Sequence, residues 1–323
     1  MRVSGLLPFM LAAAPAMVAA RGTLGLSLGH YKGENTCKGK EDWEDDLKNL
    51  KDVTKLVRTY TSSECHTAEN ILPVAAQYGF KVVLGTWVGP QNKDDESTDD
   101  KSFNADLEAL KTVIPRGKNA DAVHAITVGS ETLYRGDLTG PQLHRYIREM
   151  AKAFKEYKDI KIGTADSWNK FADGTGDSLF TDNENGPMVT YVLANAFAYW
   201  QGTDAKDAYK TYFKDMRGAM EHIQKIAGDN ADKINVVTGE TGWPTDGGTD
   251  YENAKAGTKN AEHFWKTGVC GMLDWGVDLF YFEAFDESFK PDTKGDNGEI
   301  KNEKHWGLRT ADRSPKFDIS CPK

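Results

Sequence analysis

The segment Val236-Val237-Thr238-Gly239-Glu240-Thr241-Gly242-Trp243-Pro244 begins with β-branched apolar residues and then places one carboxylate between two glycines. The apolar start predicts a buried strand, and the glycines with the following proline predict a turn at its end. A lone glutamate at such a turn is usually a solvated surface residue. However, Ala125-Ile126-Thr127-Val128-Gly129-Ser130-Glu131 repeats the design. Two carboxylates at the ends of two buried strands are the minimum apparatus for cleaving a glycosidic bond.

Similar apolar runs recur along the whole chain, and most are separated by segments with one apolar face at helical spacing. The strand-like runs cover residues 24–30, 57–61, 81–88, 125–131, 161–165, 189–197, 234–240 and 279–285. The helix-like segments cover residues 42–56, 103–113, 143–154, 209–226 and 253–266. Apolar strands without strict alternation are typical of a parallel sheet covered on both faces. Eight of them in about 300 residues predict a single-domain (β/α)8 TIM barrel.

An open, doubly wound α/β sheet is the alternative to this barrel. Such a sheet would carry a glycine-rich, phosphate-binding turn directly after an early strand. The glycines of residues 24–29 fall inside the first strand-like run instead, which favours the barrel. The charged run 93–101 and the polar run 173–187 are typical of surface loops, so neither predicts a domain boundary.

The first twenty residues have the pattern of a targeting segment. Arg2 precedes an apolar run over residues 6–18, which is too short to span a bilayer, and small residues follow up to Ala20. The sequence therefore predicts a secretory signal over residues 1–20 and a catalytic barrel domain over 21–323. The mature protein is expected to be secreted and to lack a membrane span. A net charge of −9 without a basic patch argues against nucleic acid and anionic membranes as partners.

Four cysteines, Cys37, Cys65, Cys270 and Cys321, predict two disulfides in a secreted chain. Pairing Cys37 with Cys65 and Cys270 with Cys321 closes two local loops and is favoured, while the other two pairings stay open. Their spacing matches neither a zinc ribbon nor a redox pair. No metal-ligand spacing is visible elsewhere in the sequence, so we expect no metal and no cofactor.

Polar and aromatic residues stand at the ends of the other predicted strands, where the active site of a TIM barrel lies. These residues are Arg58 and Tyr60 on the second strand, Asp166 on the fifth, Asn195 and Tyr199 on the sixth, and Glu283 and Glu287 on the eighth. Aromatic rings stack on the apolar faces of sugars, and amides and carboxylates bind sugar hydroxyls. Any one of these aromatic residues is at least as often a packing residue, but their clustering favours a sugar-binding cleft.

Residues 128–135 and 239–247 resemble the two carboxylate signatures of glycoside hydrolase family 17. Residues 194–202, 282–291 and 303–307 add to the resemblance, which runs in order over essentially the whole mature chain. Within the family, the chain is most similar to the fungal cell-wall β-1,3-glucanosyltransferases and glucan β-1,3-glucosidases of the baker's-yeast glucanase type.

The resemblance implies a retaining enzyme that acts on β-1,3-glucan, with Glu131 as general acid/base and Glu240 as nucleophile. Retention needs the two carboxyl groups about 5–5.5 Å apart. Glu131 must hold a proton, so its pKa must be raised by burial or by the charge of Glu240, which itself must be ionised. The covalent intermediate then passes to water, giving hydrolysis, or to the 3-hydroxyl of another glucan, giving transfer.

The resemblance also implies a set of sugar contacts. Ser130 stands where the wider clan of barrels has an asparagine for the sugar 2-hydroxyl, and Asn195 or a water is expected to replace that contact. Glu287 and Lys290 match a Glu-x-x-Lys pair, for which an ordinary surface ion pair is the alternative, and Glu303 matches a further carboxylate near the site. The expected substrate-binding residues are Tyr60, Ser130, Tyr134, Asp166, Asn195, Tyr199, Trp243, Glu283, Glu287 and Lys290.

Three functions remain open at this point. The first is a wall-remodelling glucanosyltransferase or glucosidase, for which Tyr199 and Trp200 would form an acceptor platform. The second is a purely hydrolytic endo-β-1,3-glucanase with the same carboxylates. The third is a non-catalytic glucan-binding wall protein, which the presence of both glutamates disfavours. In each case we expect a monomer, located in the extracellular space or cell wall, whose partner is β-1,3-glucan.

Overall fold

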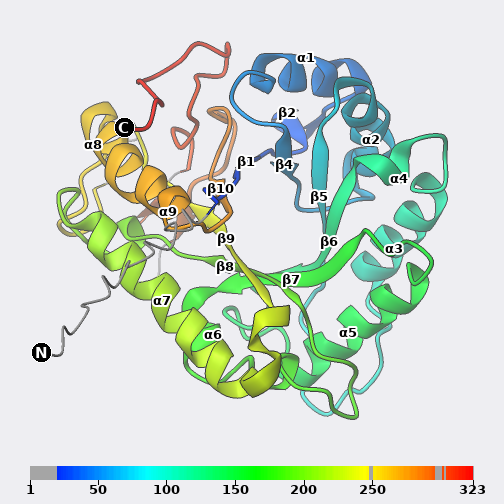
Figure 1. Ribbon diagram of the computed structural model, residues 1–323. Coiled ribbons are helices and arrows are strands. Elements are labelled where there is room, and N and C mark those ends of the chain that lie inside the picture. Colours follow the sequence, from blue (N-terminus) through cyan, green and yellow to red (C-terminus); the bar gives the residue numbers. More distant parts are fainter. Residues whose placement is uncertain (1–19, 247–249, 295–299, 302, 323) are drawn as a thin grey trace, which may run out of the picture.

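The computed structural model describes residues 20–246, 250–294, 300–301 and 303–322. Eight parallel strands form a closed barrel with the order β1-β10-β9-β8-β7-β6-β5-β4, and helices surround it (Figure 1). The barrel strands are β1 (Leu24–Ser27), β4 (Leu56–Arg58), β5 (Lys81–Thr86), β6 (Val123–Ser130), β7 (Lys161–Ser167), β8 (Tyr191–Asn195), β9 (Asn235–Thr241) and β10 (Leu279–Tyr281). Each lies within or overlaps a predicted strand, and the closed order excludes the open sheet.

The helices pack their apolar faces against the outside of the barrel. They are α1 (Lys40–Leu50), α2 (Thr67–Tyr78), α3 (Lys101–Val113), α4 (Asn119–Ala122), α5 (Gly140–Ala153), α6 (Trp168–Ala172), α7 (Ala208–Ala227), α8 (Thr258–Phe264) and α9 (Cys270–Asp274). In α5, Thr139 and Gln142 form a capping box, and Leu143, Ile147 and Met150 are buried at helical spacing. The start and the inner face of this helix are thus both encoded locally.

Several helices differ from the prediction, and the short helices α4 and α6 were not predicted at all. The predicted helix 42–56 ends at Leu50, because the Thr54 hydroxyl donates to the carbonyl of Leu24 and accepts from the amide of Leu56, which turns the chain into β4. The predicted helix 253–266 starts only at Thr258 and continues through a π-helical turn into α9. Helix α2 was not predicted, because Pro73 lies inside it and proline usually ends a helix.

The barrel interior is filled by side chains and forms the floor of the site. A buried cluster contains Leu56, Val83, Ala125, Ala165, Tyr191, Leu193, Val237 and Phe280, which come from β4 through β10. A larger apolar layer lies between the strands and the helices. The barrel is therefore a packed core without a pore, and any cleft must lie at its end.

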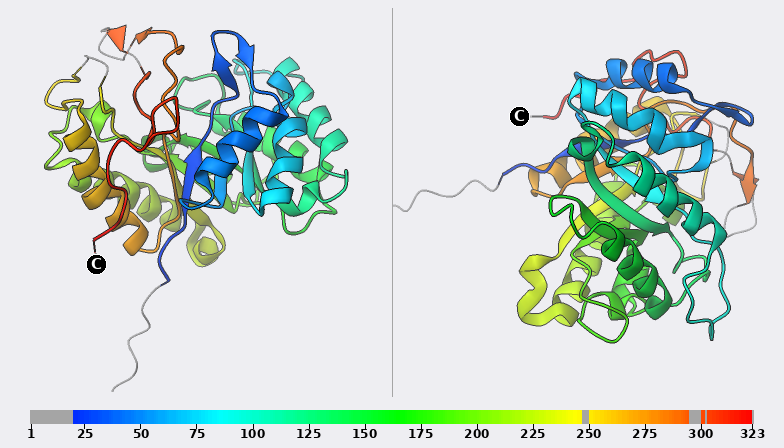
Figure 2. Two further views of the ribbon diagram at one scale, coloured as in Figure 1. Left: turned by 90° about the horizontal axis from the view of Figure 1, so that it is seen from above. Right: turned by 90° about the vertical axis from the view of Figure 1, so that its right-hand side faces the viewer.

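Two short hairpins extend beyond one end of the barrel. They are β2 (Tyr31–Gly33) with β3 (Thr36–Cys37), and β11 (Thr293–Lys294) with β12 (Ile300–Lys301). Figure 2 shows both at the same end, with the C-terminus at the other. Because the first hairpin directly follows β1, this is the end where the parallel strands terminate. Strands this short carry no sequence periodicity, and neither hairpin was predicted.

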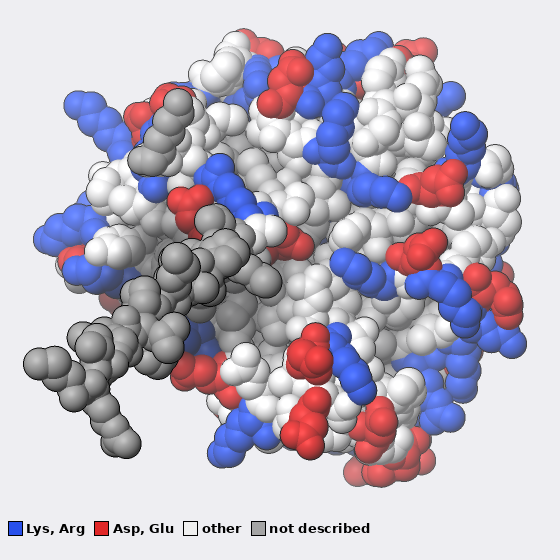
Figure 3. Space-filling view, viewed as in Figure 1, with Lys and Arg blue, Asp and Glu red and all other residues white. Residues whose placement is uncertain are grey.

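Both favoured disulfides are present. Cys37 pairs with Cys65, which joins β3 to the turn before α2, and Cys270 pairs with Cys321, which joins α9 to the C-terminal segment. The predicted signal over residues 1–20 lies outside the described residues, apart from Ala20, and stays a prediction. Within the described part of the chain, no helix is both long and apolar enough to cross a membrane. On the face seen in Figure 3, acidic and basic side chains are interspersed.

A buried ion network joins the two ends of the chain. The Asp46 carboxylate on α1 is fully buried, with Lys38 Nζ at 2.9 Å and Arg313 Nη2 at 2.5 Å. Lys38 Nζ also donates to the carbonyl of Gly29 at 2.8 Å. The network therefore holds together α1, the segment that follows β1, and the C-terminal segment.

Replacing Asp46 with alanine is expected to lower the free energy of unfolding by about 3–5 kcal/mol, because Lys38 stays buried without its carboxylate. The matched control is Asp45→Ala, one residue away on α1, which removes an exposed ion pair with Arg313. This control is expected to cost less than about 1 kcal/mol. Urea unfolding measures both values, and similar values for the two variants would contradict a structural role for the buried network.

Candidate active site

The two predicted glutamates lie at the same end of the barrel. Glu131 directly follows β6, and Glu240 is the penultimate residue of β9. Two strands, β7 and β8, separate them in the closed order. Burial raises the pKa of Glu131, and the negative charge of Glu240 raises it further. The two carboxylates therefore interact across the mouth of the barrel.

The backbone turns sharply to aim Glu131. Its φ of 56° lies in the left-handed region, and its amide donates to the carbonyl of Ala165 at 2.9 Å. Gly129, with φ 74°, has no room for a side chain, since a Cβ there would lie 2.9 Å from Thr132. The Asn195 amide nitrogen then donates to Glu131 Oε1 at 3.0 Å, which fixes the carboxyl group.

Asp166 holds the loop that carries Glu131. Its carboxylate accepts from the backbone amides of Leu133 at 2.7 Å, Tyr134 at 3.1 Å and Ser167 at 2.8 Å. Burial raises its pKa to about 7, although these three donors oppose the shift. The carboxylate is fully buried, and backbone amides already donate hydrogen bonds to both of its oxygens. The prediction that Asp166 contacts substrate is therefore not supported, and the residue positions the loop instead.

Glu240 has a cationic partner, whereas no such ion pair of Glu131 occurs within the part of the chain that the structure describes. Arg58 Nη1 lies 3.0 Å from Glu240 Oε1 and donates to the carbonyl of Gly239 at 2.7 Å. Burial raises the pKa of Glu240, whereas the Arg58 guanidinium and the Tyr60 hydroxyl lower it. The same guanidinium lies 4.9 Å from the centre of the Tyr60 ring. Arg58 thus favours the ionised form of Glu240.

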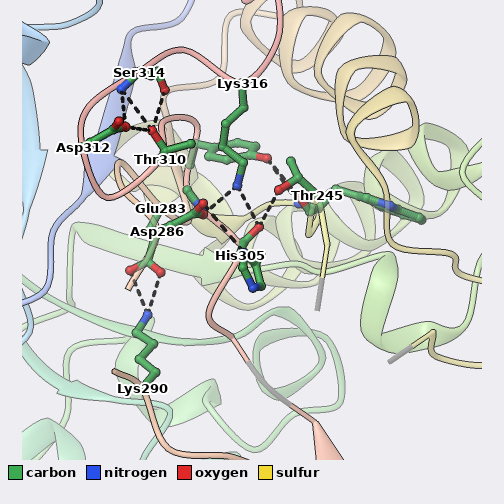
Figure 4. A network of polar contacts seen from close by, with 12 residues as sticks. Thr245, Glu283, Asp286, Lys290, His305, Thr310, Asp312, Ser314 and Lys316 are labelled. Atoms are coloured by element: carbon green, nitrogen blue, oxygen red, sulfur yellow. Dashed lines mark hydrogen bonds and ion pairs between the residues drawn. The ribbon is translucent and has the colours of Figure 1, made fainter. Parts of the chain in front are cut away.

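Three further carboxylates surround Lys290 beside Glu240. Lys290 Nζ lies 2.7 and 2.8 Å from the two oxygens of Glu283 and 3.2 Å from Glu287 Oε2, and Figure 4 shows it pointing at Glu283. Burial would lower the pKa of Lys290, but the charges of Glu283, Glu287 and Glu303 raise it above its ordinary value. Glu283 and Glu287 are buried, so this is not an ordinary surface ion pair.

The C-terminal segment holds the loop that carries these groups. The Asp286 carboxylate accepts from the amide of Gly307 at 3.0 Å and from Lys316 Nζ at 2.6 Å. Lys316 also donates to the carbonyl of His305 at 3.2 Å, as Figure 4 shows. The loop after β10 is therefore fixed by residues far beyond it in the sequence.

A cavity of about 730 Å³ opens between the β2–β3 hairpin and the loop after β10. Its lining includes Gly29, His30, Tyr31, Tyr60, Phe282, Glu283, Glu287, Phe289, Lys290 and Glu303. It thus contains four of the expected substrate-binding residues. A second cavity, of about 750 Å³, lies along the outside of α7 and contains none of them. We take the first as the candidate sugar-binding cleft, because Tyr60, Lys290 and Glu303 in its lining each shift the pKa of Glu240.

The predicted aromatic contacts divide into two groups. Tyr199 and Trp243 are 1% and 0% exposed and pack edge to face with centroids 5.0 Å apart, so a sugar contact is not supported for either. Trp200 stacks on the buried Trp306 at 5.3 Å. In contrast, Tyr134 is 39% exposed beside Glu131. The aromatic residues Tyr199 and Trp243, which follow β8 and β9, therefore pack inside the protein, whereas Tyr134, which follows β6, reaches the surface.

The sequence interpretation overlooked Trp87. This residue directly follows β5, and its side chain is 40% exposed. It stood last but one in the predicted strand 81–88, so the reasoning applied to the other strand ends would have identified it.

Ser130 is partly exposed, and its carbonyl accepts from Arg135 Nη1 at 2.6 Å. Within the described residues, no group of three or more potential metal ligands occurs.

Comparisons with known proteins agree with this architecture. The model of the BtgE/BtgC glycoside hydrolase domain matches residues 25–307. A glucan 1,3-β-glucosidase of Arthroderma benhamiae is 52% identical over 321 residues, covering 99% of this chain and 98% of that protein. One from Saccharomyces cerevisiae is 37% identical over 314 residues, covering 95% and 93%. A crystal structure of a glycoside hydrolase family 17 β-1,3-glucanosyltransferase from Rhizomucor miehei has a TM-score of 0.74 at 25% identity, covering 92% and 97%.

The raised pKa of Asp166 predicts in which direction the stability of the protein changes with pH. A value of about 7 in the folded protein, against an ordinary value of 3.8, means that folding takes up a proton between these pH values. The free energy of unfolding contributed by Asp166 therefore falls as the pH rises from 4 to 7. Between pH 4 and pH 7, the wild type should therefore lose unfolding free energy relative to the Asp166→Asn variant. Urea unfolding at both pH values measures this difference, and a constant or opposite trend would contradict it.

Proposed function

The chain belongs to glycoside hydrolase family 17, and from this premise we propose that it cleaves β-1,3-glucan through a covalent intermediate. Glu240 would be the nucleophile and Glu131 the general acid and base. One observation carries this assignment: the two buried carboxylates have opposite environments. Glu240 is paired with the Arg58 guanidinium, whereas Glu131 is bonded by the neutral amide of Asn195. Burial raises the pKa of both carboxyl groups, but Arg58 opposes this shift at Glu240, so Glu131 is the better placed of the two to hold a proton.

The first step forms the glycosyl-enzyme. A Glu240 oxygen bonds to the anomeric carbon while the bond to the glycosidic oxygen breaks, and its electron pair goes to that oxygen. Glu131 gives its proton to the leaving oxygen, so the leaving sugar departs as an alcohol. In the second step Glu131 takes a proton from water or from a sugar 3-hydroxyl. The oxygen so activated bonds to the anomeric carbon, and the ester bond to Glu240 breaks.

The donor sugars would occupy the cavity next to Glu240. Tyr60, Glu283, Glu287 and Lys290 line it and offer hydroxyl, carboxylate and ammonium groups to sugar hydroxyls. Asn195 lies against Glu131 with its carbonyl oxygen buried and without a hydrogen-bond partner among the described residues. Because this oxygen is inaccessible here, the contact to a sugar hydroxyl that the sequence assigned to Asn195 or to a water stays a prediction.

The relatives favour a β-1,3-glucan substrate and leave two outcomes for the intermediate. The two fungal relatives are named glucan 1,3-β-glucosidases, and the Rhizomucor miehei protein is a β-1,3-glucanosyltransferase. We propose that this protein transfers to glucan acceptors as well as to water, and that it acts as a monomer in the extracellular space or cell wall after removal of residues 1–20. A purely hydrolytic enzyme with the same carboxylates is the alternative.

Product length distinguishes these outcomes. Incubation with one linear β-1,3-gluco-oligosaccharide at millimolar concentration should give products both shorter and longer than the donor, detected by mass spectrometry. Longer products require transfer, and exclusively shorter products would establish hydrolysis alone. The Glu240→Gln variant should give no products, because a neutral amide cannot attack the anomeric carbon. An active Glu240→Gln variant would overturn the assignment of the nucleophile.

The Glu131→Gln variant tests the general acid. Its turnover of an oligosaccharide should fall by about 10²–10⁴, since the leaving sugar oxygen no longer receives a proton. With a dinitrophenyl glycoside, whose leaving group needs no proton, formation of the glycosyl-enzyme should fall much less. The burst of dinitrophenolate measures this first step directly. Equal losses with both donors would argue against an acid role for Glu131.

A further inference from the structure

We propose that Trp87, with Tyr134 and Arg135, forms the platform that binds the acceptor sugar and so decides between transfer and hydrolysis. This inference rests on the proposed function and adds to it the site of the second sugar. Trp87 and Tyr134 are among the few large hydrophobic side chains that the described part of the protein exposes, at 40% and 39%. Both follow barrel strands at the end that carries the two glutamates.

Trp87 is held firmly although it is exposed. Its backbone amide donates to Asp106 Oδ2 at 2.8 Å. The other oxygen of this buried carboxylate accepts from the backbone amides of Ser62 at 2.9 Å and Ser63 at 2.6 Å. One side chain of α3 thus fixes the loops after both β4 and β5. A ring on a fixed backbone loses little freedom when a sugar stacks on it.

Arg135 connects the Trp87 ring to the loop of the acid/base. Its guanidinium lies 4.7 Å from the centre of the Trp87 ring, and its Nη1 donates to the carbonyl of Ser130, the residue before Glu131. Its Nε donates to Asp137 at 2.8 Å. The Arg135 charge also lowers the pKa of Glu131, although burial dominates and raises it. The Trp87 ring is therefore linked through short contacts to the proton donor.

The strand order places this platform on the acceptor side. Trp87 and Tyr134 follow β5 and β6, on the Glu131 side of the barrel. The cavity beside Lys290 is lined by residues that follow β4, β1 and β10, and β10 is next to the strand of Glu240. The leaving sugar receives its proton from Glu131, so it must lie on the Glu131 side. An acceptor enters by the reverse of that path, because Glu131 deprotonates the attacking hydroxyl at the same position.

The chemistry of the platform suits a sugar and not a water. The apolar face of a pyranose ring can stack on an indole, and the guanidinium of Arg135 supplies donors for sugar hydroxyls. Water gains nothing from an aromatic face. The platform therefore raises the occupancy of the acceptor site by sugar relative to water. It replaces the pair Tyr199–Trp200 suggested by the sequence, since Tyr199 is buried.

The test uses a nitrophenyl β-1,3-linked glucobioside as donor and a short β-1,3-gluco-oligosaccharide as acceptor. Nitrophenol release measures formation of the glycosyl-enzyme without a leaving sugar, and chromatography separates transfer from hydrolysis products. Trp87→Ala should lower the ratio of transfer to hydrolysis about tenfold, as expected for the loss of one stacking contact. Trp87→Phe should lower it less, because a smaller ring remains.

The matched control is Trp275→Ala. Trp275 is equally exposed, at 41%, but directly follows α9 and lies against Phe213 on α7, away from both glutamates. This variant should keep the wild-type ratio. An unchanged ratio in Trp87→Ala, or an equal fall in Trp275→Ala, would overturn the proposal.

The proposal and the proposed function can fail separately. If the wild type releases no nitrophenol, the proposed glycoside-cleaving function is wrong. If the wild type only hydrolyses, the same platform must hold the leaving sugar. Trp87→Ala should then lower kcat/KM for a β-1,3-gluco-oligosaccharide about tenfold more than for the nitrophenyl donor. If kcat/KM falls equally for the two donors, Trp87 does not bind the leaving sugar, and the roles of the two glutamates are unaffected.

Discussion

The ion pair between Arg58 and Glu240 crosses the mouth of the barrel, from β4 to β9, with β1 and β10 between them in the closed order. Arg58 is fully buried, so its charge is compensated within the protein by this carboxylate and by the carbonyl of Gly239. A buried cation and a buried anion are each costly alone, and together they stabilise a charged group where the reaction needs one. The asymmetry between Glu240 and Glu131 follows from this pair, because no cation among the described residues forms an ion pair with Glu131.

The mouth of the barrel concentrates negative charge well beyond these two groups. Burial raises the pKa of Glu131, Glu240, Glu283 and Glu303, and also that of the supporting residue Asp166. Lys290 compensates one part of this cluster and Arg58 another. The two cations oppose the effect of burial most directly beside Glu240, where Arg58 lies 3.0 Å from the carboxylate and Lys290 also lowers its pKa.

The barrel and both glutamates were predictable from the sequence, because buried parallel strands are continuous apolar runs and their ends are marked by glycine. Helix α2 was not, since Pro73 argues locally against a helix that tertiary packing nevertheless stabilises. The aromatic residues show a second limit. Sequence position gave the strand end for Tyr199, Trp243 and Trp87, but not the direction of each ring. Tyr199 packs inside against Trp306 and Trp243, and Trp243 packs against Phe264, whereas only the fold reveals that Trp87 remains outside.

The cleft draws its walls from distant parts of the chain. The hairpin after β1 forms one wall, and the loop after β10, fixed to Lys316 through Asp286, forms the other. During synthesis both glutamates leave the ribosome well before Glu303 and Lys316 do. A nascent chain can therefore form much of the barrel while its cleft still lacks one wall. Synthesis must therefore reach these later residues before the cleft has both of its walls.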